Sequence, residues 1–264
     1  MRIKFTKMSG AGNDFVFLGP ECARLVPRLS EVARTLCRRR LSVGADGLVL
    51  VDQGPAGILM RYFNSDGSEA SFCGNGARCL VRYCVVKGIA SGRIKFTSGS
   101  GEHWGEVGEG GVTVDMAAPV LVGRTVVGVG GRDYDVRLIE AGVPHAVILG
   151  GPIGGLDVAR AGREIRHHSA FMPGGANVDF VDSAGGAPFG LRTYERGVEK
   201  ETLACGSGCV ASALALRLEG LAGAEVALKV ASGDVLTVRL PGEGGGQASL
   251  AGPAVVVYEG EIDL

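Results

Sequence analysis

The sequence lacks a long apolar run, an excess of either charge, and the paired C-x-x-C spacing of metal-binding cysteines. Its first residues, Met1–Lys7, alternate apolar and charged side chains as a strand does, so we expect neither a secretory signal nor a membrane span. A net charge of −1 and a pI near 6.4 provide no general attraction for nucleic acid or for an acidic membrane. These absences argue against membrane proteins and nucleic-acid-binding proteins.

The cysteines are seven, an odd number, and their irregular spacing disfavours a disulfide framework and a structural zinc site. We therefore expect no bound metal, and a reducing compartment, the cytoplasm, as the location. The seven lie at Cys22, Cys37, Cys73, Cys79, Cys84, Cys205 and Cys209.

Glycine is the abundant residue, at 45 of 264 positions. The glycines separate short apolar runs, which predicts many short strands joined by tight turns. Four helices are predicted from apolar residues at helical spacing, at residues 30–40, about 75–87, 156–167 and about 207–219. Gly88 and Gly220 are expected to end the second and fourth of these helices, which are almost wholly apolar and therefore central to the fold.

Two matching turns, Cys73–Arg78 and Cys205–Val210, each place one thiol ahead of a helix. An arginine precedes each cysteine at a nearly equal distance: Arg61 by 73 − 61 = 12 residues and Arg192 by 205 − 192 = 13 residues. This internal repeat predicts two related lobes, residues 1–116 and residues 117–252, with the boundary beside a glycine-rich stretch.

The same repeat is visible upstream, where Asn13 and Asn177 each follow a glycine-rich turn. Asparagine tolerates left-handed backbone conformations, so either residue alone would be read as a turn former. Their matching placement favours contact with a substrate.

The paired turns have the chemistry to bind a carboxylate and to activate a thiol. A glycine-rich turn that opens a helix leaves backbone N–H groups unpaired, here those of Gly74, Asn75, Gly206 and Ser207. These donors favour thiolate over thiol and stabilise negative charge that develops on a carboxylate. A thiolate on one face of a carbon and a thiol on the other, with the sulfurs about 6 to 7 Å apart, can invert a stereocentre. The sequence carries no signature for pyridoxal phosphate, so the protein itself would stabilise the carbanion.

As an ordered set, the motifs of the chain resemble those of the diaminopimelate epimerase family. They are Gly10–Phe15, Phe63–Glu69, Cys73–Arg78, Gly142–His145, Ala176–Asn177, Tyr194–Gly197 and Ala204–Gly208. The resemblance implies an α+β fold of two pseudo-symmetric lobes, each a curved, mostly antiparallel sheet wrapped around a central helix. It also implies that a C-terminal strand, residues 253–264, returns to the first lobe.

In function, the resemblance implies a cytoplasmic isomerase that interconverts LL- and meso-diaminopimelate for lysine and peptidoglycan precursor synthesis. The reaction would need no cofactor and would take place in a cleft between the lobes, and a homodimer is expected. Cys73 and Cys205 would be the two acid–base residues, supported by His145 and Glu195. The residues implied to contact the amino-acid substrate are Asn13, Asn64, Gly74, Asn75, Asn177, Glu195, Arg196, Gly206 and Ser207.

Two positions depart from the family pattern: Gly47, where some members have Gln, and Val143, where many have Asn. Each departure removes a side-chain amide that could touch the substrate, so a racemase of another amino acid stays open. A thiol redox or metal-binding protein is the alternative of a different class. By itself, His145 could be a structural histidine, Glu195 with Arg196 could be a surface ion pair, and the five cysteines outside the turns are expected in the core.

Overall fold

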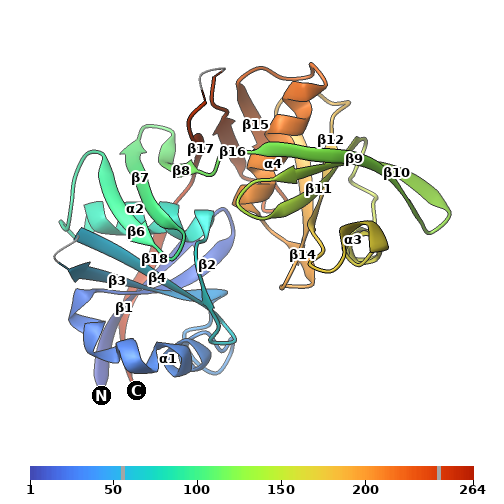
Figure 1. Ribbon diagram of the computed structural model, residues 1–264. Coiled ribbons are helices and arrows are strands. Elements are labelled where there is room, and N and C mark those ends of the chain that lie inside the picture. Colours follow the sequence, from blue (N-terminus) through green and yellow to red (C-terminus); the bar gives the residue numbers. More distant parts are fainter. Residues whose placement is uncertain (55–56, 243–244) are drawn as a thin grey trace. The chain divides into compact units, whose positions relative to one another are not determined.

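The computed structural model describes residues 1–54, 57–242 and 245–264 (Figure 1). The chain forms two compact units: unit 1 comprises residues 1–114 and 252–264, and unit 2 comprises residues 115–251. Within the described ranges there are four α-helices, and none of them is long and apolar enough to cross a membrane.

Unit 1 is a mixed sheet that encloses one helix. Its elements are β1 (Arg2–Gly10), β2 (Asn13–Leu18), η1 (Pro20–Arg28), α1 (Leu29–Leu36), β3 (Gly47–Gly54), β4 (Gly57–Asn64), β5 (Glu69–Ala70), α2 (Gly74–Val86), β6 (Ile94–Ser98), β7 (Gly101–Gly108), β8 (Gly111–Met116) and β18 (Val255–Asp263). The pairs β2–β3 and β4–β6 are parallel, whereas β1–β18, β1–β2, β3–β4, β4–β5, β6–β7 and β7–β8 are antiparallel.

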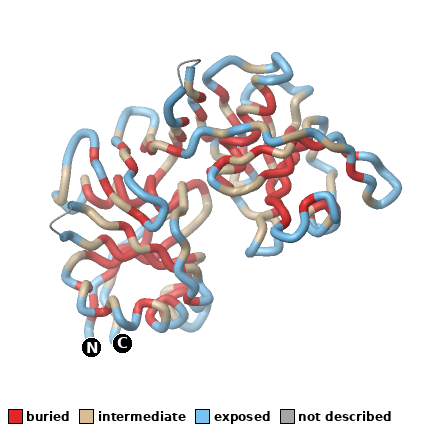
Figure 2. The backbone as a smooth tube through the Cα atoms, viewed as in Figure 1, coloured by how far each residue is buried: buried red, intermediate tan, exposed pale blue. Residues whose placement is uncertain are grey.

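The central strands β2 and β3 are buried along most of their length, whereas β18 is largely exposed (Figure 2). Residues such as Leu48 and Leu50 of β3 pack with η1 and α1 on one face. On the other face, the ring of Phe17 stacks on Tyr83 of α2 with centroids 5.4 Å apart. Strands β1 to β4, β7 and β18 all contact α2, so the sheet wraps around the helix.

Unit 2 repeats this plan. Its elements are β9 (Val120–Val129), β10 (Arg132–Glu140), β11 (Pro144–Gly150), α3 (Val158–Arg166), η2 (Ser169–Phe171), β12 (Asn177–Asp182), β13 (Phe189–Glu195), β14 (Lys200–Thr202), α4 (Gly206–Leu218), β15 (Glu225–Lys229), β16 (Val235–Arg239) and β17 (Ala248–Gly252). The parallel pairs are β11–β12 and β13–β15, and β9–β10, β10–β11, β12–β13, β13–β14, β15–β16 and β16–β17 are antiparallel. The predicted α+β class, with two pseudo-symmetric lobes around central helices, is confirmed.

The matching pairings fix which positions are equivalent. Strands β4, β5 and helix α2 correspond to β13, β14 and α4, and in both units an arginine makes a bidentate ion pair with a glutamate: Arg61 with Glu69, and Arg192 with Glu201. The predicted repeat from arginine to cysteine is therefore a structural repeat.

The upstream part of the predicted repeat is wrong. Asn13 begins β2, whereas Asn177 begins β12, and β12 corresponds to β3. The two turns also differ in conformation, since Ala11 and Gly12 both have positive φ before Asn13, whereas only Gly175 does before Asn177. Glycine and asparagine are common in turns of several kinds, so their recurrence does not show that two strands are equivalent.

The helices confirm three of the predicted segments closely, and Gly88 and Gly220 have left-handed φ angles of 67° and 69° just beyond α2 and α4. The first helix ends at Leu36 instead of residue 40. The backbone N–H of Gly44 bonds back to the Leu36 carbonyl, and Arg40 itself has φ 69°, so the chain has already left the helix there.

Candidate active site

In unit 1, Cys73 is the N-cap residue of α2. Its extended backbone (φ −147°, ψ 115°) turns the side chain over the first helical turn, where the Gly76 N–H donates to Sγ at 3.5 Å. The thiol donates to Oδ1 of Asn13 at 3.8 Å. The half-buried sulfur therefore lies at the positive end of a helix, beside a backbone donor and an amide oxygen.

The orientation of the Asn13 amide is set by its neighbours. Its Nδ2 donates to Asp46 at 2.7 Å, and its Oδ1 accepts from Nδ2 of Asn75 at 3.4 Å. Asp46 is held by Arg39, which also bonds Asp14 at 2.6 Å. Two carboxylates and a guanidinium thus lock the asparagine so that its oxygen faces Cys73.

The Asn75 side chain is used inside the protein. It is buried, donates to Asn13 and accepts from Nη2 of the fully buried Arg78 at 2.8 Å. What Asn75 offers to a ligand is consequently its backbone N–H, next to that of Gly74 in the first turn of α2.

In unit 2, Cys205 is the N-cap residue of α4, with 7% of its surface exposed. Its Sγ lies 3.5 Å from the hydroxyl of Ser207. Burial raises the pKa of the Cys205 thiol well above its ordinary value, and the negative charges of Glu195 and Asp179 raise it further. The Ser207 hydroxyl and the Gly208 N–H oppose this shift without cancelling it, so the thiol form is favoured.

A buried hydrogen-bond chain leads away from Cys205. His145, fully buried, is 3.0 Å from the Ser207 hydroxyl through Nε2 and 2.6 Å from Asp179 through Nδ1. The ionised carboxylate accepts the Nδ1 hydrogen, which leaves Nε2 as the acceptor for Ser207. Thr193 donates to the second oxygen of Asp179 at 2.7 Å and fixes its position. The chain connects the sulfur to an imidazole nitrogen that can take or return a proton.

Asp179 was not among the predicted site residues; Glu195 was the carboxylate predicted to support the site together with His145. Asp179 lies two residues beyond Asn177 on β12, so both side chains are on the same face of the strand. The Asn177-Val-Asp179 spacing was the signal that could have identified it. Glu195 lies close enough to Cys205 for its charge to act on the thiol.

The remaining predicted contacts of unit 2 gather at the carboxyl end of β13. Asn177 is buried, donates toward Nε2 of His145 at 3.3 Å and accepts the backbone N–H of Arg196 at 2.7 Å. The Arg196 guanidinium is only partly buried and bonds the carbonyl oxygens of Gly174 and Gly175 weakly, at 3.5 and 3.4 Å. It is available to bind a carboxylate.

Asn64, the equivalent of Glu195 in unit 1, ends β4. Its Oδ1 accepts the hydroxyl hydrogen of Tyr62 at 2.9 Å and its Nδ2 donates to the hydroxyl of Ser68 at 3.0 Å. The five other cysteines, Cys22, Cys37, Cys79, Cys84 and Cys209, are at most 3% exposed, which confirms their prediction as core residues.

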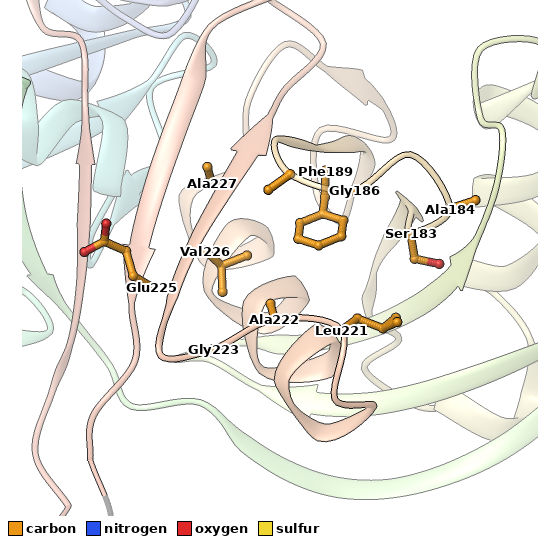
Figure 3. A pocket seen from close by; sticks show the side chains of 11 residues that line it. Ser183, Ala184, Gly186, Phe189, Leu221, Ala222, Gly223, Glu225, Val226 and Ala227 are labelled. Carbon is orange, nitrogen blue, oxygen red and sulfur yellow. The ribbon is translucent and has the colours of Figure 1, made fainter.

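A separate depression of about 410 Å³ in unit 2 is lined by Phe189, Leu221, Glu225, Val226 and smaller residues (Figure 3). Leu221 follows the C-terminal end of α4, whereas Cys205 precedes its N-terminus. A helix of this length spans about 20 Å, so the depression is not part of the surroundings of Cys205.

Comparison with known proteins decides the family. Residues 5–122 and 137–257 match the family described as diaminopimelate epimerase. The chain belongs to the diaminopimelate epimerase family. A relative named diaminopimelate epimerase from Methanocella arvoryzae is 39% identical over 100% of this chain and 98% of its own. One from Aquifex aeolicus is 37% identical over 98% of both chains.

Solved structures show the same fold outside the diaminopimelate epimerase family. A phenazine biosynthesis protein of the PhzF family from Bacillus anthracis has a TM-score of 0.76 at 16% identity, with 100% of both chains covered. A probable proline racemase from Agrobacterium radiobacter has a TM-score of 0.74 at 16% identity, covering 99% of this chain and 93% of its own. Membership of the diaminopimelate epimerase family favours an isomerase over a redox or metal-binding protein.

Proposed function

We propose that the protein interconverts LL- and meso-diaminopimelate by a two-base mechanism in which Cys73 and Cys205 act on opposite faces of the α-carbon. The observation that carries the proposal is the duplication of one arrangement: in a chain of this family, each unit has a single thiol at the N-cap of its central helix. The mechanism requires the two units to bring both sulfurs to the same carbon.

The raised pKa of Cys205 assigns the roles. Since it keeps Cys205 as a thiol, Cys205 is the acid in the direction that begins from this state, and Cys73 acts as the base once it has lost the hydrogen that it donates to Asn13. The Cys73 thiolate takes the α-proton and becomes a thiol, and Cys205 gives its proton to the other face of the carbanion and becomes a thiolate. The Ser207–His145 chain supports the charge that appears on Cys205.

Backbone N–H groups of Gly74, Asn75, Gly206 and Ser207 would hold the α-carboxylate as negative charge develops on it. At the distal end of the substrate, Arg196 would bind the second carboxylate and Glu195 the second ammonium group. Asn13, Asn64 and Asn177 would complete the binding site.

The test is incubation of LL-diaminopimelate with the reduced protein in deuterium oxide. The expected result is exchange of one α-hydrogen together with formation of the meso form. Cys73→Ser and Cys205→Ser should each nearly abolish the reaction, while Cys209→Ser, at a buried position in the same helix as the second turn, should retain it. Activity on proline or histidine but not on diaminopimelate would reject diaminopimelate as the substrate and leave the two-base mechanism in place.

A reducing cytoplasm would keep both thiols available for this reaction, and we place the protein there. The expected homodimer stays a prediction.

A further inference from the structure

Gly47 leaves a space on the site-facing side of unit 1 that Tyr62 fills. Gly47 lies directly opposite Asn64 in the β3–β4 pair, so a side chain at position 47 would stand beside the Asn64 amide. Tyr62, two residues before Asn64 and on the same face of β4, leans across this position. A Cβ atom on Gly47 would lie 2.5 Å from Cε2 of the Tyr62 ring.

The ring of Tyr62 is fixed from its other side as well. It makes an edge contact with Phe15, with centroids 6.0 Å apart, and only 9% of the residue is exposed. Phe15 in turn lies 3.6 Å from the Cβ position of Gly76, in the first turn of α2. The aromatic pair therefore connects the Cys73 turn to the strand that carries Asn64.

The hydroxyl of Tyr62 begins a directed hydrogen-bond chain. It donates to Oδ1 of Asn64, Nδ2 of Asn64 donates to the Ser68 hydroxyl, and that hydroxyl donates to Asp66 at 2.6 Å. Because Asp66 is a carboxylate and accepts only, every donor in the chain has one direction. The Asn64 amide cannot flip without losing its bond to Ser68, because that hydroxyl gives its hydrogen to Asp66. The second Nδ2 hydrogen of Asn64 remains available.

The equivalent face of unit 2 fills this space in a different way. By the matching registers, Asn177 stands where Gly47 does and Thr193 where Tyr62 does. Asn177 brings an amide to its site, and Thr193 is too short to reach beyond Asp179. At this place unit 2 has an amide side chain on β12, whereas unit 1 has a phenol on β4.

We propose that Tyr62 is a positioning residue for the epimerase reaction: its hydroxyl holds the Asn64 amide so that an N–H faces a carboxylate oxygen of the amino-acid substrate. Gly47 is the residue that admits the ring. The proposal rests on the proposed function, since Asn64 is taken as a substrate contact.

The test is a double-mutant cycle on LL-diaminopimelate with Tyr62→Phe, Asn64→Ala and the double variant. Tyr62→Phe removes one hydroxyl and should raise KM about fivefold with kcat within about twofold of wild type. Asn64→Ala should raise KM further, and adding Tyr62→Phe to it should change nothing more, because the hydroxyl acts only through the amide. Tyr83→Phe, at a buried tyrosine of the same unit, is the matched control and should behave as wild type.

Independent, multiplying effects of the two substitutions on KM, or an unchanged KM in Tyr62→Phe, would overturn the proposal.

A second measurement does not depend on activity. The side-chain amide resonances of Asn64 in the substrate-free protein should shift in Tyr62→Phe and stay in place in Tyr83→Phe. Failure of the wild-type protein to epimerise diaminopimelate would reject the proposed function. Unshifted Asn64 resonances in Tyr62→Phe would separately reject the positioning role of Tyr62.

Gly47→Ala is a second way to disturb the contact between Tyr62 and Asn64. The added methyl group meets the Tyr62 ring and also the Phe63 carbonyl oxygen, 2.7 Å from the Cβ position, so the strand and the ring must both move. KM should rise at least as much as in Tyr62→Phe. A Gly47→Ala variant with wild-type KM would contradict the role given to the ring.

Discussion

His145 and Phe15 occupy equivalent positions in the two units: His145 pairs with Asn177 across β11 and β12, and Phe15 pairs with Gly47 across β2 and β3. One unit places an imidazole over the first turn of its central helix and the other places a benzene ring there. The two thiols therefore have different surroundings. A buried hydrogen-bond chain lies beside Cys205, whereas the rings of Phe15 and Tyr62 lie near the turn that carries Cys73.

The polar chain predicts a loss of turnover when its carboxylate is neutralised. In Asp179→Asn the amide cannot accept the Nδ1 hydrogen of His145 as strongly, and the imidazole loses its fixed tautomer. We expect kcat to fall about 100-fold with little change in KM. Asp182→Asn, three residues further along the same strand, is the control in steady-state kinetics and should stay near wild type. Equal kcat values for the two variants would remove Asp179 from the mechanism.

Gly76 and Gly208 are equivalent in the two units, but we expect substitution by alanine to have different effects at the two positions. A Cβ at Gly208 would lie 2.4 Å from Oδ1 of the buried Asp179, whereas a Cβ at Gly76 would lie 3.1 Å from the flexible end of Met60. Both glycines are in a first helical turn, so the gain in helix propensity is similar and cancels in the comparison.

Gly208→Ala should therefore lose activity and at least about 2 kcal/mol of unfolding free energy, because it displaces a buried carboxylate from its partners. Gly76→Ala should cost less than about 1 kcal/mol. Urea unfolding of both variants measures the difference in unfolding free energy. Similar losses in the two variants would show that contact with Asp179 is not the reason for a glycine at position 208.

Much of this arrangement could be predicted from sequence because its signals are local. Gly88 and Gly220 end helices by φ angles that few other residues adopt, and the two cysteine turns repeat as short contiguous motifs. Asp179 has one local signal, its spacing from Asn177 on the same strand, but its partners His145 and Thr193 lie on other strands. Tyr62 has no local signal, because its role comes from a cross-strand register and no short motif records such a register.

The upstream mismatch of Asn13 with Asn177 has the same origin. Turn chemistry repeats wherever a strand follows a tight turn, so it is a poor guide to equivalence, while the strand pairing that determines equivalence is non-local. The structure instead pairs Asn177 with the position of Gly47, and that correction is what identifies the exchange between an amide and a tyrosine.

The raised pKa of Cys205 predicts slow alkylation at neutral pH. Only the thiolate reacts with iodoacetamide, and burial with the charges of Glu195 and Asp179 disfavours that form. In a Cys73→Ser background, the rate at Cys205 should keep rising through pH 9, where a thiol of ordinary pKa begins to level off. Mass spectrometry of the peptide that contains Cys205 gives the rate at each pH. Asp179→Asn should accelerate the reaction, and a rate that levels off near pH 8.5 would contradict the raised pKa.

The core thiols predict that stability falls in alkaline solution. Burial raises the pKa of Cys37, Cys79 and Cys84 from 9.0 to about 12. A thiol whose pKa is raised by folding contributes its full stability below the unfolded pKa, near 9, and loses it as pH rises from there toward 12. At pH 10 the loss is on the order of 1 kcal/mol for each thiol, because the unfolded chain ionises and the folded one does not.

Cys84→Ala isolates one of these contributions. The cavity left by the substitution costs the same free energy at every pH, so it cancels when each protein is compared with itself at pH 7 and pH 10. Between these two values the variant should lose about 1 kcal/mol less unfolding free energy than wild type, as measured by urea titration. An identical loss in both proteins would mean that Cys84 ionises as readily in the folded state as in the unfolded chain.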